Sequence, residues 1–242
     1  MPRTTQLKAA GKVAKPPPQA AFDKKIPLRS YCRTETGLFR RLHVLNLDTS
    51  DPWPAIYFST RGTTRFDPVG GVGTMCVGQS LGGALMEKFD DSWGPAGDDS
   101  RSLTEQQLNE TWETLIYLPP VTLFDCGGPN HLSKIGMDAQ MYTGEYAGTQ
   151  VWAMRMMSHP HMIDGIVFPS RHDPTRQNIA LFKRLALATP HHDPTLTIAN
   201  LPGWTPDAAH SADLIYGPMQ ILATHPELDA TLVDLEVSRV SP

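Results

Sequence analysis

The sequence contains no apolar run near the ~20 residues that a membrane-spanning helix needs. Cysteine is also scarce: Cys32, Cys76 and Cys126 are odd in number and widely spaced, which argues against a disulfide framework and favours a reducing compartment. The N-terminus carries positive charge but lacks the apolar stretch of a secretory signal peptide. We therefore expect a cytoplasmic protein with no membrane partner.

Positive charge is scarce outside the N-terminus. Residues 1–25 hold six Lys/Arg and one acidic residue, whereas the rest of the chain carries 15 basic and 24 acidic residues, a balance of −9. Phosphate contacts dominate nucleic-acid affinity, so a body this acidic predicts no direct nucleic-acid binding. Residues 1–25 also contain Pro16-Pro17-Pro18 and few bulky apolar side chains, which predicts a disordered basic tail.

Three familiar motifs are either incomplete or lack the surrounding elements that they need. The glycine run at 70–73 lacks the Lys of a P-loop, so these glycines indicate a turn. Residues 78–82 match G-x-S-x-G around Ser80, but the repeated parallel strands of an α/β-hydrolase are not indicated. The histidines at 159–161 and 191–193 lack a helical HExxH spacing or a cysteine pair, so we expect loop histidines and no metal site.

Short strands and helices alternate without regular βαβ units, which predicts an α+β fold. We expect strands at 38–47, 55–59, 74–77, 121–124, 166–168 and 179–182. Amphipathic spacing predicts helices at 81–89, 102–116, 149–157 and, more weakly, 218–225. The second of these would begin with a capping box formed by Ser102 and Glu105.

Two distant stretches, 62–89 and 164–184, concentrate polar side chains between short apolar runs. The side chains that stand out in and before them are Arg40, Arg41, Arg65, Glu87, Ser170 and Arg171. Arginine forks bind pyrophosphate through paired charge-assisted hydrogen bonds. A carboxylate can stabilise the positive charge of an oxocarbenium-like state. These are the residue types needed to hold a dinucleotide and break its glycosidic bond.

Five segments in this order resemble the RES domain, a family named for Arg, Glu and Ser. They are FRRLH (39–43), GTTRFDP (62–68), GVGTMCVGQSLGGALMEKF (71–89), LSKIGMDAQMYTGEYAGTQVWA (132–153) and DGIVFPSRHDPTRQNIALF (164–182). The resemblance covers about residues 38–186. It implies an ADP-ribosyltransferase-like fold, with a split β-sheet core flanked by helices, and an enzyme that acts on NAD+.

The resemblance also implies roles for individual residues. The catalytic set would be Glu87, Ser170 and the family's first Arg, which is Arg41 or, as the alternative, Arg40. The second family Arg falls on Arg65 and would bind substrate together with Arg171. The family often has a Tyr in the strand before the helix, where this chain has Met75-Cys76, and Tyr142 or Tyr146 would compensate.

The expected function is that of a toxin or effector that consumes NAD+ by cleaving the nicotinamide–ribose bond, with water or phosphate as acceptor. NAD+ is then a substrate, and neither a prosthetic group nor a metal is required. The alternatives are a protein ADP-ribosyltransferase and a catalytically inactive interaction module. A helix-turn-helix antitoxin or an immunity protein is the expected partner, with a homodimer as a further option. Delivery into a target cell's cytoplasm stays open.

The expected domain organisation has three parts. Residues 1–25 form the tail, 26–190 the catalytic domain, and 191–242 a C-terminal extension packed on the same domain.

Overall fold

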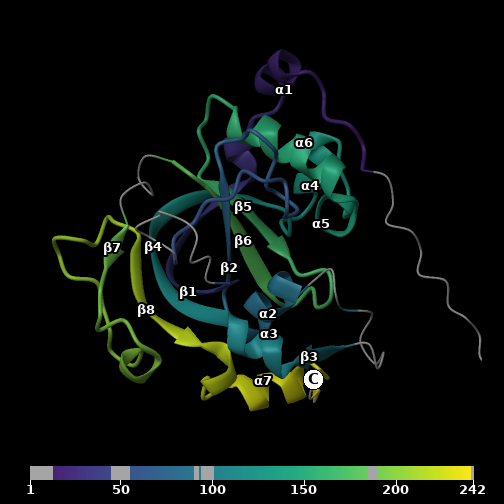
Figure 1. Ribbon diagram of the computed structural model, residues 1–242. Coiled ribbons are helices and arrows are strands. Elements are labelled where there is room, and N and C mark those ends of the chain that lie inside the picture. Colours follow the sequence, from purple (N-terminus) through teal and green to yellow (C-terminus); the bar gives the residue numbers. More distant parts are fainter. Residues whose placement is uncertain (1–12, 45–54, 90–92, 94–100, 185–189, 241–242) are drawn as a thin grey trace, which may run out of the picture.

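The computed structural model describes residues 13–44, 55–89, 93, 101–184 and 190–240. A central mixed sheet lies between two groups of helices, so the α+β class is confirmed (Figure 1). Among the described residues, the helices are all too short or too polar to cross a membrane.

The sheet has seven strands, in the order β1-β2-β6-β5-β4-β8-β7. Along the chain these are β1 (Cys32–Val44), β2 (Thr74–Gly78), β4 (Thr111–Asp125), β5 (Gly165–Pro169), β6 (Gln177–Phe182), β7 (His191–His192) and β8 (Ile215–Ile221). Most neighbours are antiparallel, whereas β4–β5 and β7–β8 are parallel.

The sheet splits at its longest strand, β4. One edge of β4 pairs with β1 along almost its whole length. The other edge is therefore shared: residues 112–117 pair with β8, and residues 123–125 pair with β5. Because β1 also pairs with β2, the strands β1, β2, β6, β5 and β4 close on themselves, and β8 and β7 branch away. The split sheet expected from the resemblance is thus present.

Helices cover the sheet in two groups (Figure 1). The helices are α1 (Gln19–Lys25), α2 (Leu81–Phe89), α3 (Glu105–Glu110), α4 (His131–Ile135), α5 (Gln140–Thr143), α6 (Tyr146–Met157) and α7 (Leu228–Asp234). One buried cluster joins α1, α4, α5 and α6 to the sheet, and another joins α2, α3 and α7. A small parallel pair, β3 (Ser102–Thr104) with β9 (Ser238–Val240), lies beside the second group.

Several predicted elements are confirmed. Helix α2 has the expected bounds, and β2, β5 and β6 cover the expected strands. The predicted helix at 149–157 lies within α6. The glycine run is a turn, with φ of 73° at Gly70 and 93° at Gly73. The predicted strand at 38–47 lies in β1 as far as residue 44, and its last residues are outside the described residues.

The helix predicted at 102–116 was right only for α3, Glu105–Glu110, because residues 102–104 form β3 and the predicted capping box of Ser102 and Glu105 is absent. The capping box is formed by Thr104 and Gln107, and the chain becomes strand β4 at Thr111. Long pairing with β1 stabilises this strand, which is rich in β-branched and aromatic residues. Leu115 and Ile116 are both buried because the strand is covered on both faces, which removes the alternation that identifies a strand.

Two weaker predictions were also wrong. Residues 218–225 form the end of β8 and a short 3-10 helix, η4 (Leu222–Thr224), because β4 offers β8 an open edge for pairing. Residues 55–59 form only an isolated bridge between Ser59 and Thr74.

The tail predicted at 1–25 was wrong for residues 13–25. Helix α1 lies against α6, and Phe22 is fully buried, edge-on to Trp152 at 5.9 Å between ring centroids. The Trp152 Nε1 donates to Ala14 O at 2.6 Å. A single aromatic anchor orders this segment, and average composition conceals such an anchor. Residues 1–12 lie outside the described residues.

Candidate active site

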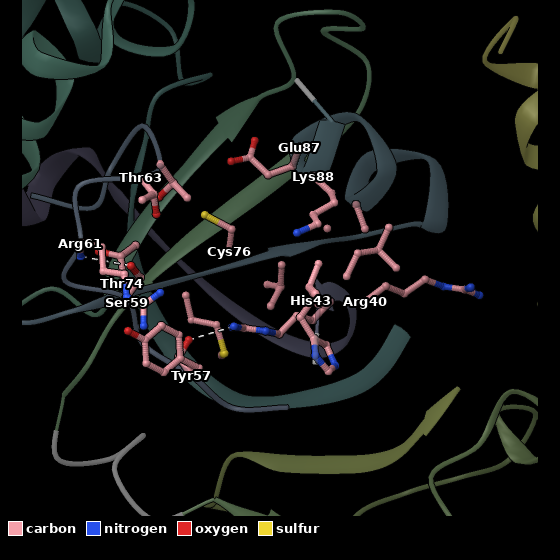
Figure 2. A pocket seen from close by; sticks show the side chains of 18 residues that line it. Arg40, His43, Tyr57, Ser59, Arg61, Thr63, Thr74, Cys76, Glu87 and Lys88 are labelled. Atoms are coloured by element: carbon pink, nitrogen blue, oxygen red, sulfur yellow. Dashed lines mark hydrogen bonds between the residues drawn. The ribbon is translucent and has the colours of Figure 1, made fainter. Parts of the chain in front are cut away.

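A pocket of about 620 Å³ opens between β1, β2, α2 and the segment at 57–64 (Figure 2). This volume is in the range of small-molecule sites, which are typically ~300–1,000 Å³. Its polar lining residues include Arg40, Arg41, His43, Arg61, Cys76, Glu87 and Lys88. The pocket therefore gathers more cationic than anionic side chains and suits an anionic ligand.

The β2–α2 turn places Glu87 and Lys88 at the pocket. A side chain at Gly78 would meet the Ala84 nitrogen at 2.5 Å, so glycine permits the helix to pack against the strand end. Every residue of α2 except Glu87 and Lys88 is buried. The two polar residues of this helix are therefore the ones left to face the pocket.

Arg41 is an almost buried cation with unused hydrogen-bonding capacity. Its side chain is held by one bond, from Nη2 to Tyr57 O at 2.9 Å. The Nε and Nη1 atoms are buried and have no hydrogen-bond partner among the described residues. Burial lowers the pKa of Arg41 to about 10, so the guanidinium stays charged at neutral pH. An uncompensated buried cation that lines a pocket is the signature of an anion site.

Arg40 borders the same pocket but is already paired. Its Nη1 donates to Glu113 Oε1 at 3.1 Å, and its Nη2 donates to Glu227 Oε1 at 2.9 Å. Glu113 is itself buried against His225, with 2.6 Å between Oε2 and Nε2. In Figure 2 the Arg40 guanidinium extends away from Glu87 and Cys76. The geometry therefore favours Arg41 over Arg40 as the family's first Arg.

Glu87 faces the thiol of Cys76 across the pocket (Figure 2). Burial raises the pKa of Cys76 well above its usual range, and the hydrogen-bonded Glu87 carboxylate raises it further. The thiol is thus protonated at neutral pH. Arg41 acts on the same thiol in the opposite direction, so Cys76 lies near both charged groups. The strand position where the family often has Tyr is occupied here by a small donor.

Two further titratable side chains, His43 and Lys88, line the pocket. His43 is buried, and its Nε2 lies 3.0 Å from Thr114 Oγ1. Burial, then Arg41 and Lys88, lowers the pKa of His43 to about 3, so the ring is neutral at physiological pH. Desolvation and the Arg41 charge also lower the pKa of Lys88.

Arg65 and Tyr146 contact each other but lie outside the set of residues that line the pocket. The Arg65 guanidinium stacks on the Tyr146 ring at 4.8 Å, and its Nη1 donates to Gly144 O at 2.5 Å. The pair fastens α6 to the segment before β2. Thr63 and Thr64, the two residues that precede Arg65 in the sequence, do line the pocket.

Ser170 and Arg171 also lie outside the lining set. Ser170 is buried, and its Oγ lies 3.4 Å from the Met86 sulfur, one residue before Glu87. The structure thus places Arg41 and Glu87 in one pocket, with Ser170 behind the helix that carries Glu87. Tyr142, the other residue expected to replace the family's Tyr, packs beside the core cluster of α4–α6 and does not line the pocket.

Sequence reasoning missed Asp67, which orders the loop at 59–63 beside the pocket. This carboxylate is fully buried, and its Oδ2 accepts from Ser59 Oγ at 2.5 Å and from the backbone nitrogens of Gly62 and Thr63 at 3.1 and 3.3 Å. These bonds fix the loop that presents Arg61. The Asp in GTTRFDP was the available signal, because Asp side chains commonly hydrogen-bond to nearby backbone groups in turns.

The G-x-S-x-G match has a structural explanation. The Ser80 hydroxyl accepts from Gly83 N at 3.1 Å, which satisfies a donor in the first turn of α2. The sheet around it is mostly antiparallel, unlike that of an α/β-hydrolase.

Comparisons with known proteins identify the fold and the family. A chain of the crystal structure of the M. tuberculosis MbcT–MbcA toxin–antitoxin complex is similar in fold, with a TM-score of 0.51 and 13% sequence identity. The match covers 66% of this chain and 81% of that chain. None of the curated proteins matches the sequence. Residues 38–200, more than half of the chain, match the family described as RES domain. The protein with this pocket between β1 and α2 therefore belongs to the RES domain family.

Proposed function

We propose that this protein is an NAD+-consuming enzyme that cleaves the bond between nicotinamide and ribose. The observation that carries the proposal is the presence, in one pocket, of a buried arginine with two unpartnered nitrogens and a carboxylate. A pyrophosphate supplies the anion that Arg41 lacks, and a ribose cation is the group that Glu87 can stabilise.

The charges of the pocket suit the two ends of the reacting molecule. Arg41 and Lys88 would hold the pyrophosphate, with Arg61 at the edge of the pocket. Glu87 would lie beside the nicotinamide ribose. As the C1′–N bond breaks, its electron pair leaves with nicotinamide, and positive charge develops on the ribose. The carboxylate stabilises that charge, and the acceptor oxygen then bonds to C1′ and loses its proton.

Cys76 orients the carboxylate in this scheme. Its S–H donates to Glu87, and its small side chain leaves space where a tyrosine would otherwise project. Ser170 and Arg65 act from outside the lining of the pocket. Ser170 supports the helix that carries Glu87, and the Arg65–Tyr146 stack supports the loop that carries Arg61.

The family and the similar structure support a toxin that acts together with an antitoxin. The solved complex pairs a toxin with an antitoxin. In our proposal, NAD+ depletion by this pocket is the means of toxicity. We propose that a protein antitoxin neutralises this chain in the cytoplasm. Val44, which lines the pocket and is 51% exposed, offers such a partner an apolar contact at the pocket.

The test is nicotinamide release from NAD+ by the purified chain, followed by chromatography. Reactions with buffer alone, with added inorganic phosphate and with added protein distinguish hydrolysis, phosphorolysis and ADP-ribosyl transfer. Glu87→Gln should reduce turnover at least ~10²-fold, equivalent to about 2.7 kcal/mol of transition-state stabilisation. Glu110→Gln, on the exposed end of α3, is the matched control and should retain full turnover.

Two results would contradict the proposal. One is the absence of nicotinamide release under all three conditions by a chain that is folded. The other is turnover by Glu87→Gln within about threefold of that of Glu110→Gln, which would make Glu87 an ordinary helix residue.

A further inference from the structure

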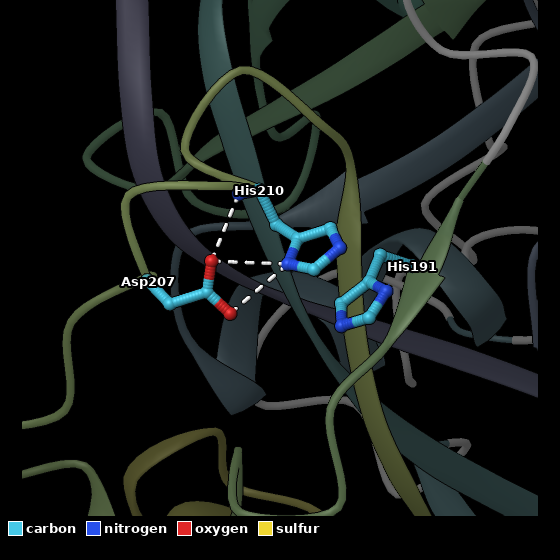
Figure 3. A group of neighbouring side chains, drawn as sticks. All are labelled: His191, Asp207 and His210. Carbon is cyan, nitrogen blue, oxygen red and sulfur yellow. Dashed lines mark hydrogen bonds and ion pairs between the residues drawn. The ribbon is translucent and has the colours of Figure 1, made fainter.

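Three side chains that commonly bind metals meet at the outer strand of the sheet (Figure 3). His191 lies on β7, and Asp207 and His210 lie in the turn region before β8. One ligand atom from each residue lies within 4.8 Å of the other two. These residues are not among those that line the candidate active site.

Backbone pairing brings the three residues together. The backbone nitrogen of His191 donates to Leu214 O at 2.8 Å, which holds β7 beside the start of β8. The turn is closed by bonds from the backbone nitrogen of His210 to Asp207 Oδ1 at 2.9 Å and from Asp213 N to His210 O at 2.9 Å. His191 therefore approaches the turn from a separate segment.

The side chains are already in contact. The rings of His191 and His210 stack with 3.6 Å between centroids and 11° between planes. The Nδ1 of His210 lies 3.0 and 2.9 Å from the two carboxylate oxygens of Asp207. In Figure 3 one ring nitrogen of His191 lies on the side that faces this carboxylate. Two imidazoles and a carboxylate thus lie together near the surface.

We propose that His191, Asp207 and His210 bind a divalent transition-metal ion of the zinc class. Two imidazole nitrogens and one carboxylate oxygen are a ligand set that zinc takes, and water can complete the coordination. The Asp207 side chain is 64% exposed and that of His210 is 34% exposed, so solvent has access. The ion would join β7 to the turn before β8 and thereby fix the edge of the sheet.

Small side-chain movements are enough to form the site. Zinc bonds to nitrogen and oxygen are ~2.0–2.2 Å long, so two ligand atoms on one tetrahedral ion lie about 3.3–3.6 Å apart. The ligand atoms here lie within 4.8 Å of one another, so the widest-spaced of them must move inward by up to about 1.5 Å. Parallel rings direct their lone pairs in parallel, so at least one ring must tilt. Binding therefore replaces both the ring stack and the bond between Asp207 and His210.

The experiment is calorimetric titration of the full chain, freed of metal by a chelator, with zinc chloride. We expect one bound ion per chain. His191→Ala and His210→Ala should each weaken zinc binding more than about tenfold, because loss of even an outer partner of a metal ligand has an effect of this size. His192→Ala is the matched control: this neighbouring residue is exposed, and its ring contacts Tyr216 instead. Its affinity should stay within about threefold of wild type.

A second measurement separates a specific site from general histidine binding. Denaturant unfolding with and without zinc should show stabilisation of the wild type and of His192→Ala, but not of His191→Ala. Unfolding in chelator should be similar for all variants, which shows that they fold. The proposal is overturned if the wild type does not bind zinc at about 100 µM, or if His191→Ala and His210→Ala bind it as the wild type does.

Discussion

The two adjacent arginines of β1 allow binding and stability to be separated. We consider Arg41→Met and Arg40→Met, because methionine keeps most of the alkyl stem and removes the charge. Arg41 offers two unpartnered donors, Nε and Nη1, to a bound anion. A hydrogen bond to a charged group contributes ~1.5–3 kcal/mol, so losing two should cost at least about 3 kcal/mol, or roughly 10²-fold in affinity.

The free energy of unfolding should fall more for Arg40→Met than for Arg41→Met, which is the reverse of the order expected for the loss of affinity. Removal of Arg41 loses one bond to Tyr57 O but also removes a buried cation that has no counter-ion, so the free energy of unfolding should change by less than about 1 kcal/mol or rise. Removal of Arg40 leaves Glu113, which is 2% exposed, without its arginine partner. Breaking a buried pair costs ~3–5 kcal/mol, and about 2–4 kcal/mol is expected here because Glu227, the other partner, is 45% exposed.

Binding is measured by calorimetry with ADP-ribose, which keeps the pyrophosphate and is not consumed. Stability is measured by urea unfolding of the same samples without ligand. Arg41→Met should lose affinity and keep stability, whereas Arg40→Met should lose stability and, at temperatures where it is folded, keep most of its affinity. The reasoning is refuted if Arg41→Met binds ADP-ribose within about threefold of wild type while losing as much stability as Arg40→Met.

Three further outcomes follow from particular contacts. Phe22→Ala should lower the free energy of unfolding by ~3–5 kcal/mol in denaturant titrations, because a fully buried ring is removed from the contact with α6; a loss below about 1 kcal/mol would mean that α1 is not part of the core. Cys76→Ala should lower turnover with little change in ADP-ribose affinity, and Cys76→Ser should restore part of it; equal turnover in all three proteins would exclude a role for the thiol as a donor to Glu87. The pKa of His43 is about 3 in the folded chain against an ordinary value of 6.5, so the unfolded chain binds a proton first as pH falls. The contribution of His43 to stability is therefore complete above pH ~6.5 and declines towards pH ~3, with a loss of about 2 kcal/mol at pH 5. His43→Gln should remove this part of the decline from unfolding curves, and an unchanged pH profile would contradict the reasoning.

The resemblance to the family made part of the site predictable. It assigned Glu87, which lines the pocket, and also Arg65 and Ser170, which do not. The position of Glu87 after an apolar run would by itself fit an exposed helical residue equally well. Strand alternation could not separate Arg40 from Arg41, because apolar residues accompany each of them on its own face of β1, and the choice required the burial seen in the structure.

The features that sequence did not predict depend on distant pairing. Strand β4 has helical apolar spacing at its start, and only its long ladder with β1 decides that it is extended. The ion pair that occupies the Arg40 guanidinium depends on Glu227, nearly two hundred positions away. The wall formed by Lys88, Cys76 and His43 required the packing of α2 against β1. None of these contacts leaves a periodic trace in the chain.

The ion pairs of Arg40 have a practical consequence for how the protein can be divided. The match to the family ends at residue 200, yet β8, His225 and Glu227 all follow it. A shortened protein that stops at the end of the match would leave an edge of β4 without β8 and Glu113 without His225. Such a fragment should aggregate on expression, since an unpaired strand edge is a template for association. The smallest unit that can fold is therefore longer than the stretch by which the family is recognised.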